Sequence, residues 1–290
     1  MAENEKPKWE GVKKSQREST IRGLGLEQNV VEKFIVNLSL DELIKLSVSD
    51  DKEEKYIKNG TTILAALTKN SLILMADSRS QRVSGDFSTS NFVDTTNKIH
   101  QLGQYFFEIA GVSHFREIDI YYLVSINFDT TLSLKSNSEK LQKIIFDVLT
   151  SYYNNLTTLE LDYFHQSIPT WGMLQIFIGG YEQKTNNTPS FTQLEFKIQN
   201  EESFYSVTIG NNYTIRFEKG QTGLIDGGAH ENIDKLLKNG YNKDNLTIDN
   251  LKYLISVEAD ANDTIGHDYN YVIIKRDSFK LGSSYEVKLP

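Results

Sequence analysis

From residue 61 onward the predicted strands and helices come in blocks, and this block order limits the possible fold more than any other feature of the sequence. Three strands are followed by two helices, four strands, two helices and a last strand. The predicted segments are 62–67, 71–76 and 105–110, then 114–126 and 138–154, then 173–181, 192–198, 204–209 and 213–217, then 231–238 and 248–259, and finally 269–275. Alternating β-α units would favour a parallel sheet, whereas blocks of strands and helices favour α+β layers. The sequence therefore predicts an α+β domain over residues 61–290.

The helix predictions depend on the spacing of apolar residues and on possible N-caps. In the segment 138–154, Leu141 and Ile145 lie on one helical face, and residues 136–138 offer serine and asparagine caps. Thr247 precedes the last predicted helix and is its candidate cap. These signals predict amphipathic helices that pack on the sheets.

Residues 1–60 differ from the rest of the chain. They contain 23 charged side chains and no strong strand pattern. An amphipathic stretch at 30–36 has the spacing to pack on another surface, and residues 50–58 are nearly all charged, which is typical of a solvated linker. We interpret residues 1–60 as a candidate propeptide. The alternative is an N-terminal extension that is never removed.

Composition excludes several classes of function. A net charge of −8 argues against a general nucleic-acid binder, and no apolar run approaches the roughly 18 residues of a membrane span. The chain has no cysteine, which excludes disulfides and thiol catalysis. The histidines show no metal-ligand spacing and no glycine-rich loop fits a nucleotide phosphate, so we expect no metal and no other cofactor. The charged N-terminus is unlike a signal peptide, and we expect a cytoplasmic protein.

A possible nucleophile lies at the start of the first predicted strand, in Gly60-Thr61-Thr62. If the bond between Gly60 and Thr61 were cut, Thr61 would carry a free α-amino group beside its hydroxyl, and that amine would serve as the base. An α-amino group has a pKa of about 7.7–8.0, so a neutral fraction exists at physiological pH. The alternative is that both threonines are ordinary β-branched strand residues.

Three further motifs follow in order. Residues 76–79 read Ala-Asp-Ser-Arg, residues 95–102 read Thr-Thr-Asn-Lys-Ile-His-Gln-Leu, and residues 106–111 read Phe-Phe-Glu-Ile-Ala-Gly. Together with the Gly-Thr-Thr start, this series resembles the N-terminal part of a proteasome β-type subunit, a threonine peptidase of the N-terminal-nucleophile (Ntn) hydrolase family. Asp77 follows Thr61 at the spacing of that family. The lysine comes about five residues late because residues 83–91 carry extra length.

The resemblance implies a fold and a set of roles. The implied fold is a four-layer αββα sandwich, with two antiparallel sheets between two helical layers. Thr61 would be the nucleophile, Lys98 would lower the proton affinity of Thr61, and Asp77 would keep Lys98 charged and oriented. The Gly111 N–H would face the developing oxyanion, and Arg79 would brace Asp77. For Asp77 and Lys98, the alternative is a plain salt bridge.

Other positions implied by the resemblance are less well matched. Thr96 and Ile109 would line the substrate pocket, together with residues 80, 100 and 113. Asp263 is the best match to a further supporting aspartate, and Asp260 is the alternative. Thr264 would offer a hydroxyl where a serine is missing.

The chain also departs from the family's pattern in two segments. The family's Gly-Ser-Gly motif is replaced by Ile-Asp-Gly-Gly-Ala at 225–229, so a serine that supports the threonine amine is missing or has moved. Residues 186–220 also contain an extra predicted hairpin. These departures leave the nucleophile, the lysine and the aspartate intact but weaken the support expected around the amine.

The first functional hypothesis is a threonine-type endopeptidase that cuts itself between Gly60 and Thr61 and then hydrolyses peptide or protein substrates. The resemblance implies a ring-shaped homo- or hetero-oligomer, with an AAA+ unfoldase as a candidate partner. From the charge and the lack of a long apolar run, we expect no nucleic-acid and no membrane partner. The second hypothesis is a catalytically decayed ring or scaffold subunit that retains residues 1–60 as a docking arm. The third is an Ntn amidase that acts on a small substrate.

Overall fold

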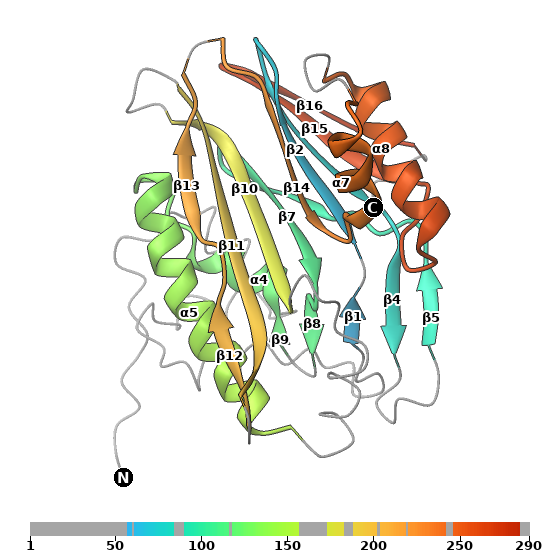
Figure 1. The fold of residues 1–290 in the computed structure, drawn as a ribbon. Coiled ribbons are helices and arrows are strands. Elements are labelled where there is room, and N and C mark those ends of the chain that lie inside the picture. The colour runs from blue at the N-terminus through green and yellow to red at the C-terminus, as the bar shows by residue number, and fades with distance from the viewer. Residues whose placement is uncertain are drawn as a thin grey trace, which may run out of the picture.

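The computed structural model describes residues 57–59, 61–83, 90–115, 118–156, 173–182, 188–201, 204–218, 220–241 and 246–284. The chain forms an α+β fold (Figure 1). Its helices in these ranges are α4 (Ile120–Asn127), α5 (Leu134–Asn154), α7 (Glu231–Lys238) and α8 (Ile248–Ala261). Its strands are β1 (Ile57–Asn59), β2 (Thr62–Leu67), β3 (Leu72–Asp77), β4 (Ser80–Val83), β5 (Ser90–Val93), β6 (Ile99–Leu102), β7 (Tyr105–Gly111), β8 (His114–Phe115), β9 (Ile118–Asp119), β10 (Leu174–Glu182), β11 (Thr188–Glu201), β12 (Phe204–Ile209), β13 (Tyr213–Arg216), β14 (Gly223–Gly228), β15 (Tyr269–Lys275) and β16 (Ser278–Ser283).

The strands form three sheets, and every strand pair among the described residues is antiparallel. One sheet has the order β14-β2-β3-β15-β16. A second has the order β12-β11-β10-β7-β6, with β13 also paired to β11. A smaller sheet, β5-β4-β1-β8-β9, lies at one end of the molecule and contains the segment that immediately precedes Gly60.

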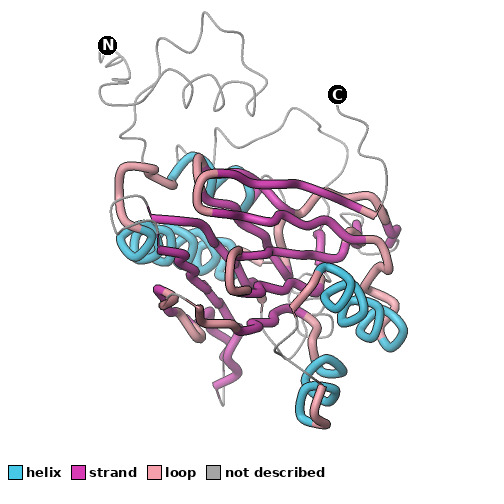
Figure 2. Tube along the Cα trace, turned by 90° about the horizontal axis from the view of Figure 1, so that it is seen from above, coloured by secondary structure: helices cyan, strands magenta, loops and turns pink. Residues whose placement is uncertain are grey.

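Three apolar clusters hold these elements together. We call the sheet with the order β14-β2-β3-β15-β16 the β14–β16 sheet, and the sheet with the order β12-β11-β10-β7-β6 the β12–β6 sheet. These two sheets pack on each other through residues such as Ile63, Leu74 and Phe177. A second cluster joins the outer face of the β12–β6 sheet to α4 and α5, and a third joins the outer face of the β14–β16 sheet to α7 and α8. Figure 2 shows the strands in the middle and the helices on either side. Strands β2 and β3 are buried along their whole length because both of their faces are covered.

Several predicted segments agree with the structure. The boundaries of β2, β12, α7 and β15 match the prediction, and Thr247 caps α8 by accepting a hydrogen bond from the backbone N–H of Asn250. The extra hairpin predicted within 186–220 is formed by β11 and β12, with β13 pairing back onto β11.

Two helix predictions were wrong at their starts. The helix predicted from residue 114 begins at Ile120, because residues 114–115 and 118–119 form the paired strands β8 and β9, and the Asp119 carboxylate caps the helix by accepting from Tyr122 N. The helix predicted from residue 138 begins at Leu134, because Ser133 rather than residues 136–138 provides the cap. Strands β14 and β16 had not been predicted. The amphipathic stretch at 30–36 lies outside the described residues.

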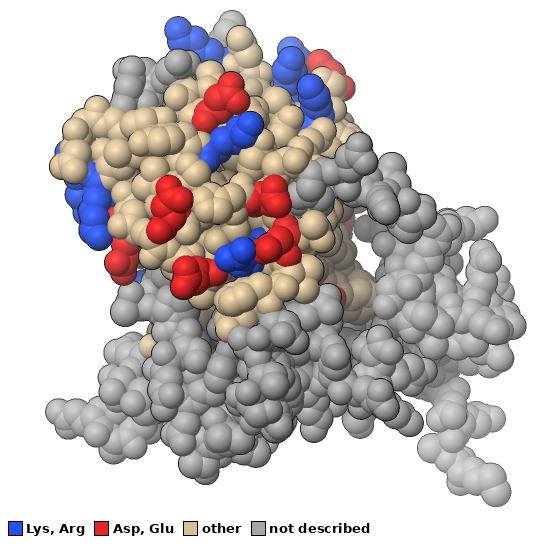
Figure 3. Space-filling model, turned by 90° about the vertical axis from the view of Figure 1, so that its right-hand side faces the viewer, with Lys and Arg blue, Asp and Glu red and all other residues tan. Residues whose placement is uncertain are grey.

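The described surface has mixed charge on the face shown in Figure 3, where basic and acidic side chains are interspersed rather than gathered into a patch of one sign. Lys238 with Asp234 in α7 and Lys252 with Asp249 in α8 form ion pairs along the helices. In the described ranges, no helix has the length and apolar character needed to cross a membrane.

Candidate active site

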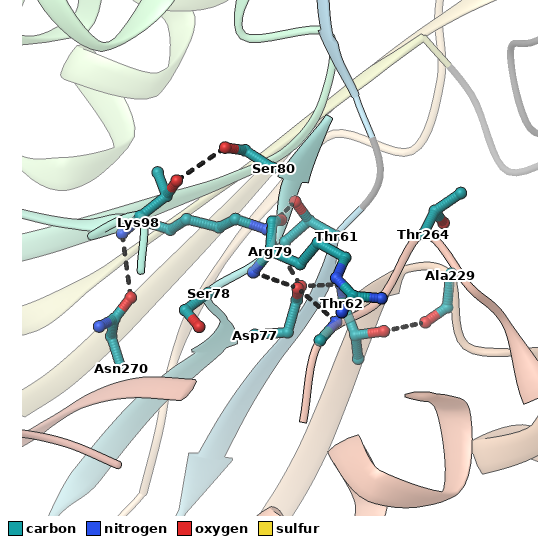
Figure 4. Close-up of polar contacts among 12 residues, drawn as sticks. Thr61, Thr62, Asp77, Ser78, Arg79, Ser80, Lys98, Ala229, Thr264 and Asn270 are labelled. Carbon is teal, nitrogen blue, oxygen red and sulfur yellow. Dashed lines mark hydrogen bonds and ion pairs between the residues drawn. The ribbon is translucent and has the colours of Figure 1, made fainter. Parts of the chain in front are cut away.

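The β2–β3 hairpin brings the predicted nucleophile next to the predicted aspartate. The Thr68 side chain closes the turn by accepting from Ser71 N at 3.0 Å. The antiparallel register that follows pairs Ile63 with Ala76, so the start of β2 lies beside the end of β3. Residues 61 and 77 are therefore neighbours in space, although they are sixteen positions apart in the sequence (Figure 4).

Asp77 is fully buried and lies at the centre of a hydrogen-bond network. Its Oδ1 accepts from the backbone N–H of Thr62 at 2.8 Å, and its Oδ2 accepts from the backbone N–H groups of Arg79 at 2.9 Å and Gly266 at 3.2 Å. Lys98 Nζ also donates to Oδ1, at 3.1 Å. Four donors from separate segments thus fix the orientation of this carboxylate.

The side chain of Lys98 joins the nucleophile to the aspartate. Its Nζ donates to Thr61 Oγ1 at 2.6 Å, to Asp77 Oδ1, and to the carbonyl oxygen of Arg79. The backbone N–H of Lys98 donates to Asn270 Oδ1 on β15 at 3.2 Å, which holds the base of the side chain in place. Thr61, Asp77 and Lys98 are each at most 3% exposed, so water does not screen their contacts.

Burial shifts the pKa values of this pair. Burial lowers the pKa of Lys98 from its ordinary value, while the attraction and hydrogen bond of Asp77 oppose that shift. Burial also raises the pKa of Asp77, against Lys98 and the N–H donors of Thr62 and Gly266, which lower it. Both shifts have the same cause, because a low-dielectric interior penalises each charged form. The lysine therefore holds its proton less tightly than a solvent-exposed lysine would.

Arg79 links this centre to the surface. Its guanidinium forms two hydrogen bonds with Asp94, Nε to Oδ1 at 2.5 Å and Nη2 to Oδ2 at 3.2 Å. Its Nη1 donates to the carbonyl oxygen of Asp263 at 2.8 Å. The carboxylate of Asp263 belongs to an exposed residue, and Asp260 is 3.6 Å from His267 on the surface. The structure therefore brings Asp263 to Arg79 through its backbone, and its predicted support of the threonine amine stays a prediction.

The segment that replaces Gly-Ser-Gly packs directly against Thr61. Strand β14 pairs Gly228 with Thr62, and the Ala229 N–H donates to the Thr61 carbonyl at 3.0 Å. Thr62 Oγ1 donates in return to the Ala229 carbonyl at 2.7 Å. Gly228 has φ +70°, and a Cβ built there would lie 1.9 Å from the Thr61 carbonyl oxygen. This backbone therefore requires glycine at the position, and a serine does not fit.

Two residues that had not been predicted support this segment from the opposite sheet. Gln175 on β10 accepts from the Gly228 N–H at 2.6 Å and donates to Glu195 Oε1 on β11 at 2.9 Å. Glu195 Oε2 accepts from Asn211 N at 2.7 Å, so β11 anchors the chain of contacts. In the sequence, the only sign of this contact chain is that polar residues, Gln175 and Glu195, stand at strand positions that are buried.

The remaining predicted site residues lie close by but play different parts in the structure. Thr96 Oγ1 is 2.7 Å from Ser80 Oγ, and Ile109 belongs to the apolar cluster that faces α4 and α5. Gly111 has φ +94°, and a Cβ there would lie 2.3 Å from the Met173 carbonyl oxygen just before β10, so the backbone by itself requires glycine at this position. The pocket and oxyanion roles of these residues stay predictions.

The segment before the proposed cut is held as a strand. β1 pairs with β4 in the register Ile57 with Val83 and Asn59 with Gln81, and it pairs with β8 through Lys58 and His114. Gly60 itself lies outside the described residues. The chain that leads to Thr61 is thus inserted between two strand edges.

The other predicted hydroxyl is used elsewhere, because Thr264 Oγ1 donates to Asn262 Oδ1 at 2.8 Å. Across the described ranges, no group of three or more histidine, aspartate or glutamate side chains is placed to hold a metal ion. The chemistry that the site can offer is a buried lysine–aspartate pair that acts on a threonine hydroxyl.

Comparison of the chain with models of known protein families finds no match, and a search of curated proteins finds no significantly similar sequence.

Proposed function

We propose that this chain is an Ntn hydrolase of the proteasome-like type, in which Thr61 cleaves the bond before itself and then hydrolyses peptide bonds. The observation that carries the proposal is the 2.6 Å hydrogen bond from Lys98 Nζ to Thr61 Oγ1, with Asp77 bound to the same ammonium. An N-terminal threonine needs a nearby cation that lowers the proton affinity of its hydroxyl, and this geometry supplies one.

The arrangement of the layers supports the same proposal. The two larger sheets pack face to face, and each carries a pair of helices on its outer face. We propose that this is the four-layer αββα sandwich of Ntn hydrolases, with the site at the end of the space between the sheets.

Self-cleavage would proceed by an N-to-O acyl shift. Thr61 Oγ attacks the Gly60 carbonyl carbon, a C–O bond forms, and the C–N bond breaks as the Thr61 nitrogen takes up a proton. Water then hydrolyses the resulting ester, which releases a Gly60 carboxylate and a free Thr61 amine. In later turnovers that amine takes the hydroxyl proton, and Lys98 stabilises the developing alkoxide.

The position of β1 supports a peptide as the substrate. Residues 57–59 pair with β4 on one side and with β8 on the other, and they lead directly to Thr61. A peptide that enters after cleavage would use the same strand edges, and main-chain hydrogen bonds would hold it with its scissile carbonyl next to Thr61. Assembly into a ring and partnership with an AAA+ unfoldase remain proposals from the resemblance alone.

A non-catalytic subunit of the same fold is the second candidate. Two observations favour it: Gly228, in the segment that lacks the expected serine, has no room for a side chain, and Asp263 is an exposed residue. In this case Asp77 and Lys98 would form a structural ion pair, and residues 1–60 would remain attached.

The intact mass of the purified protein tests the proposal. We expect a fragment that begins at Thr61 from the wild type, the same fragment more slowly from Thr61→Ser, and none from Thr61→Ala. The conservative serine variant keeps a hydroxyl and so separates chemistry from folding. A full-length mass for the folded wild type after prolonged incubation would refute the proposal and favour the non-catalytic subunit.

A further inference from the structure

One buried acidic side chain has no part in the site described above. Glu108 lies in the middle of β7, where its strand neighbours Phe106 and Ala110 face the opposite sheet. The residues directly across from it, Ile99 on β6 and Phe177 on β10, belong to the same apolar cluster. Because residues opposite one another in antiparallel strands share a face, Glu108 also points into the space between the sheets.

This carboxyl group is in an unusual position. Glu108 is 0% exposed, and within the described part of the chain neither of its oxygens has a hydrogen-bond partner. Other buried glutamates are paired; Glu182, for example, accepts from Leu134 N at 2.8 Å and from Arg216 Nε at 3.0 Å. A buried polar group without a partner destabilises the folded state, so Glu108 is better explained by a role in function than by a role in stability.

The electrostatic neighbours of Glu108 point to that role. Burial raises the pKa of Glu108 well above its ordinary value, and the positive charge of Lys98 opposes that shift. Glu108 also interacts with Tyr121 on α4, whose pKa is raised by burial and by nearby acids. Asp77 and Arg79 are the other charged groups that act on Lys98. Lys98 is thus the cation that acts on Glu108, and it is also the cation that contacts Thr61.

We propose that Glu108 is a positioning residue for Lys98: it is a neutral acid while Thr61 is in peptide linkage, and it ionises when cleavage adds the Thr61 amine to the same buried site. The O–H bond of Glu108 breaks, its proton leaves to solvent, and the electron pair stays on the carboxylate. The inference builds on the proposed function, since it needs the released amine.

The charges before and after cleavage give the physical argument. In the uncut chain, Asp77 already balances Lys98. The Thr61 amine in its protonated form would compete with Lys98 for one negative charge in this low-dielectric site, and Lys98 would lose its proton more easily. An ionised Glu108 supplies the second negative charge, which keeps Lys98 protonated beside the nucleophile.

The test uses Glu108→Gln, which keeps the shape but cannot ionise, and Glu182→Gln as a matched control at a buried, paired glutamate on the far end of β10. In the cleaved enzyme, we expect Glu108→Gln to move both limbs of the kcat/KM pH profile to lower pH by on the order of one unit. Glu182→Gln should leave the profile unchanged and lower the melting temperature. An unchanged profile for Glu108→Gln would overturn the proposal.

Infrared spectroscopy of the uncut chain gives a readout that needs no activity. With Thr61→Ala blocking cleavage, the carbonyl band of a protonated carboxylic acid should be present, and adding Glu108→Gln should remove it. No such band at neutral pH would overturn the neutral-acid state even if the wild type is an active hydrolase. A wild type that never cuts would instead refute the proposed function and the ionisation step, while the band would still decide the state of Glu108 in the uncut chain.

Discussion

Restoring a serine to the segment that replaces Gly-Ser-Gly should impair this protein. The resemblance to Ntn hydrolases implies a serine in this segment, and Gly228→Ser would place a hydroxyl there. The structure argues against this substitution, because a Cβ on Gly228 would lie 1.9 Å from the Thr61 carbonyl oxygen and 2.9 Å from the Ala110 Cβ. Both contacts involve the backbone or Cβ atoms of buried strands, which cannot rotate away.

The expected cost has two parts. The left-handed backbone, φ +70° at Gly228, costs about 1–2 kcal/mol for any residue with a Cβ. Bringing the Cβ to an ordinary contact of 3.4 Å needs a movement of about 1.5 Å. That movement breaks the hydrogen bonds of Gly228 N with Gln175 and of Ala229 N with Thr61 O, at about 1 kcal/mol each. The expected total is therefore about 3–4 kcal/mol.

A matched control isolates the collision. Gly240 has φ +90°, but nothing lies within 4 Å of the position that a Cβ would take there, so Gly240→Ala carries only the backbone cost of about 1–2 kcal/mol. We expect Gly228→Ala and Gly228→Ser to unfold at clearly lower denaturant concentration than Gly240→Ala. The rate of self-cleavage should fall by about 100-fold for both Gly228 variants, since misplacing a reacting group by about 1 Å has an effect of that order.

Urea titration and time-resolved intact mass measure the two effects. A Gly228→Ser protein that is as stable as Gly240→Ala and cuts itself as fast as the wild type would refute the argument from backbone contact. Faster cleavage than the wild type would show that the absent serine, rather than the packing of Gly228 against Thr61, limits the chemistry.

Further predictions concern single contacts of the site. Thr62→Val removes the hydroxyl that donates to the Ala229 carbonyl at 2.7 Å, so the free energy of unfolding should fall by about 1–2 kcal/mol. Thr62→Ser keeps the hydroxyl and should keep most of the wild-type stability, and urea titration distinguishes the two variants. Lys98→Met leaves the buried Asp77 carboxylate without its cation, so stability should fall by about 3 kcal/mol and no Thr61 fragment should form; normal cleavage by a folded Lys98→Met protein would contradict the mechanism. Because burial raises the pKa of Glu108 above the unfolded value, the native state binds more protons and this group's contribution to stability is lost as pH rises above about 4.5. In the uncut Thr61→Ala background, the melting temperature with Glu108→Gln added should therefore increase, relative to the background alone, from about pH 5 to about pH 7, and a constant difference would count against the shift.

The parts of the fold that sequence predicts well are those whose pattern is local. Strands β2 and β3 are almost entirely apolar because both of their faces are buried, and such runs can be recognised without tertiary information. Strands β14 and β16 escaped prediction because one is rich in glycine and the other is largely exposed. Their strand conformation comes from pairing with β2 and β15, which the sequence does not encode locally.

The same difference between local and long-range signals applies to the residues of the site. Thr61 and Asp77 lie at adjoining ends of one local hairpin, and Lys98 lies after β4 and β5, just before β6, so the series of motifs described above was enough to nominate all three residues. Gln175 and Glu195 could not be nominated in this way. They act on Gly228 across the space between two sheets, and only the packing of those sheets brings positions 53 residues apart into hydrogen-bond contact.

The strand that precedes Thr61 also has a consequence for the proposed binding of a peptide substrate. Residues 57–59 pair with β4 and β8 at the same time, so both strand edges are taken while this segment stays attached. A tethered occupant competes at an effective concentration in the millimolar range, far above that of most free peptides. Under the proposed function, the uncut chain would therefore act as its own competitive inhibitor until cleavage breaks the tether, after which dilution would favour exchange.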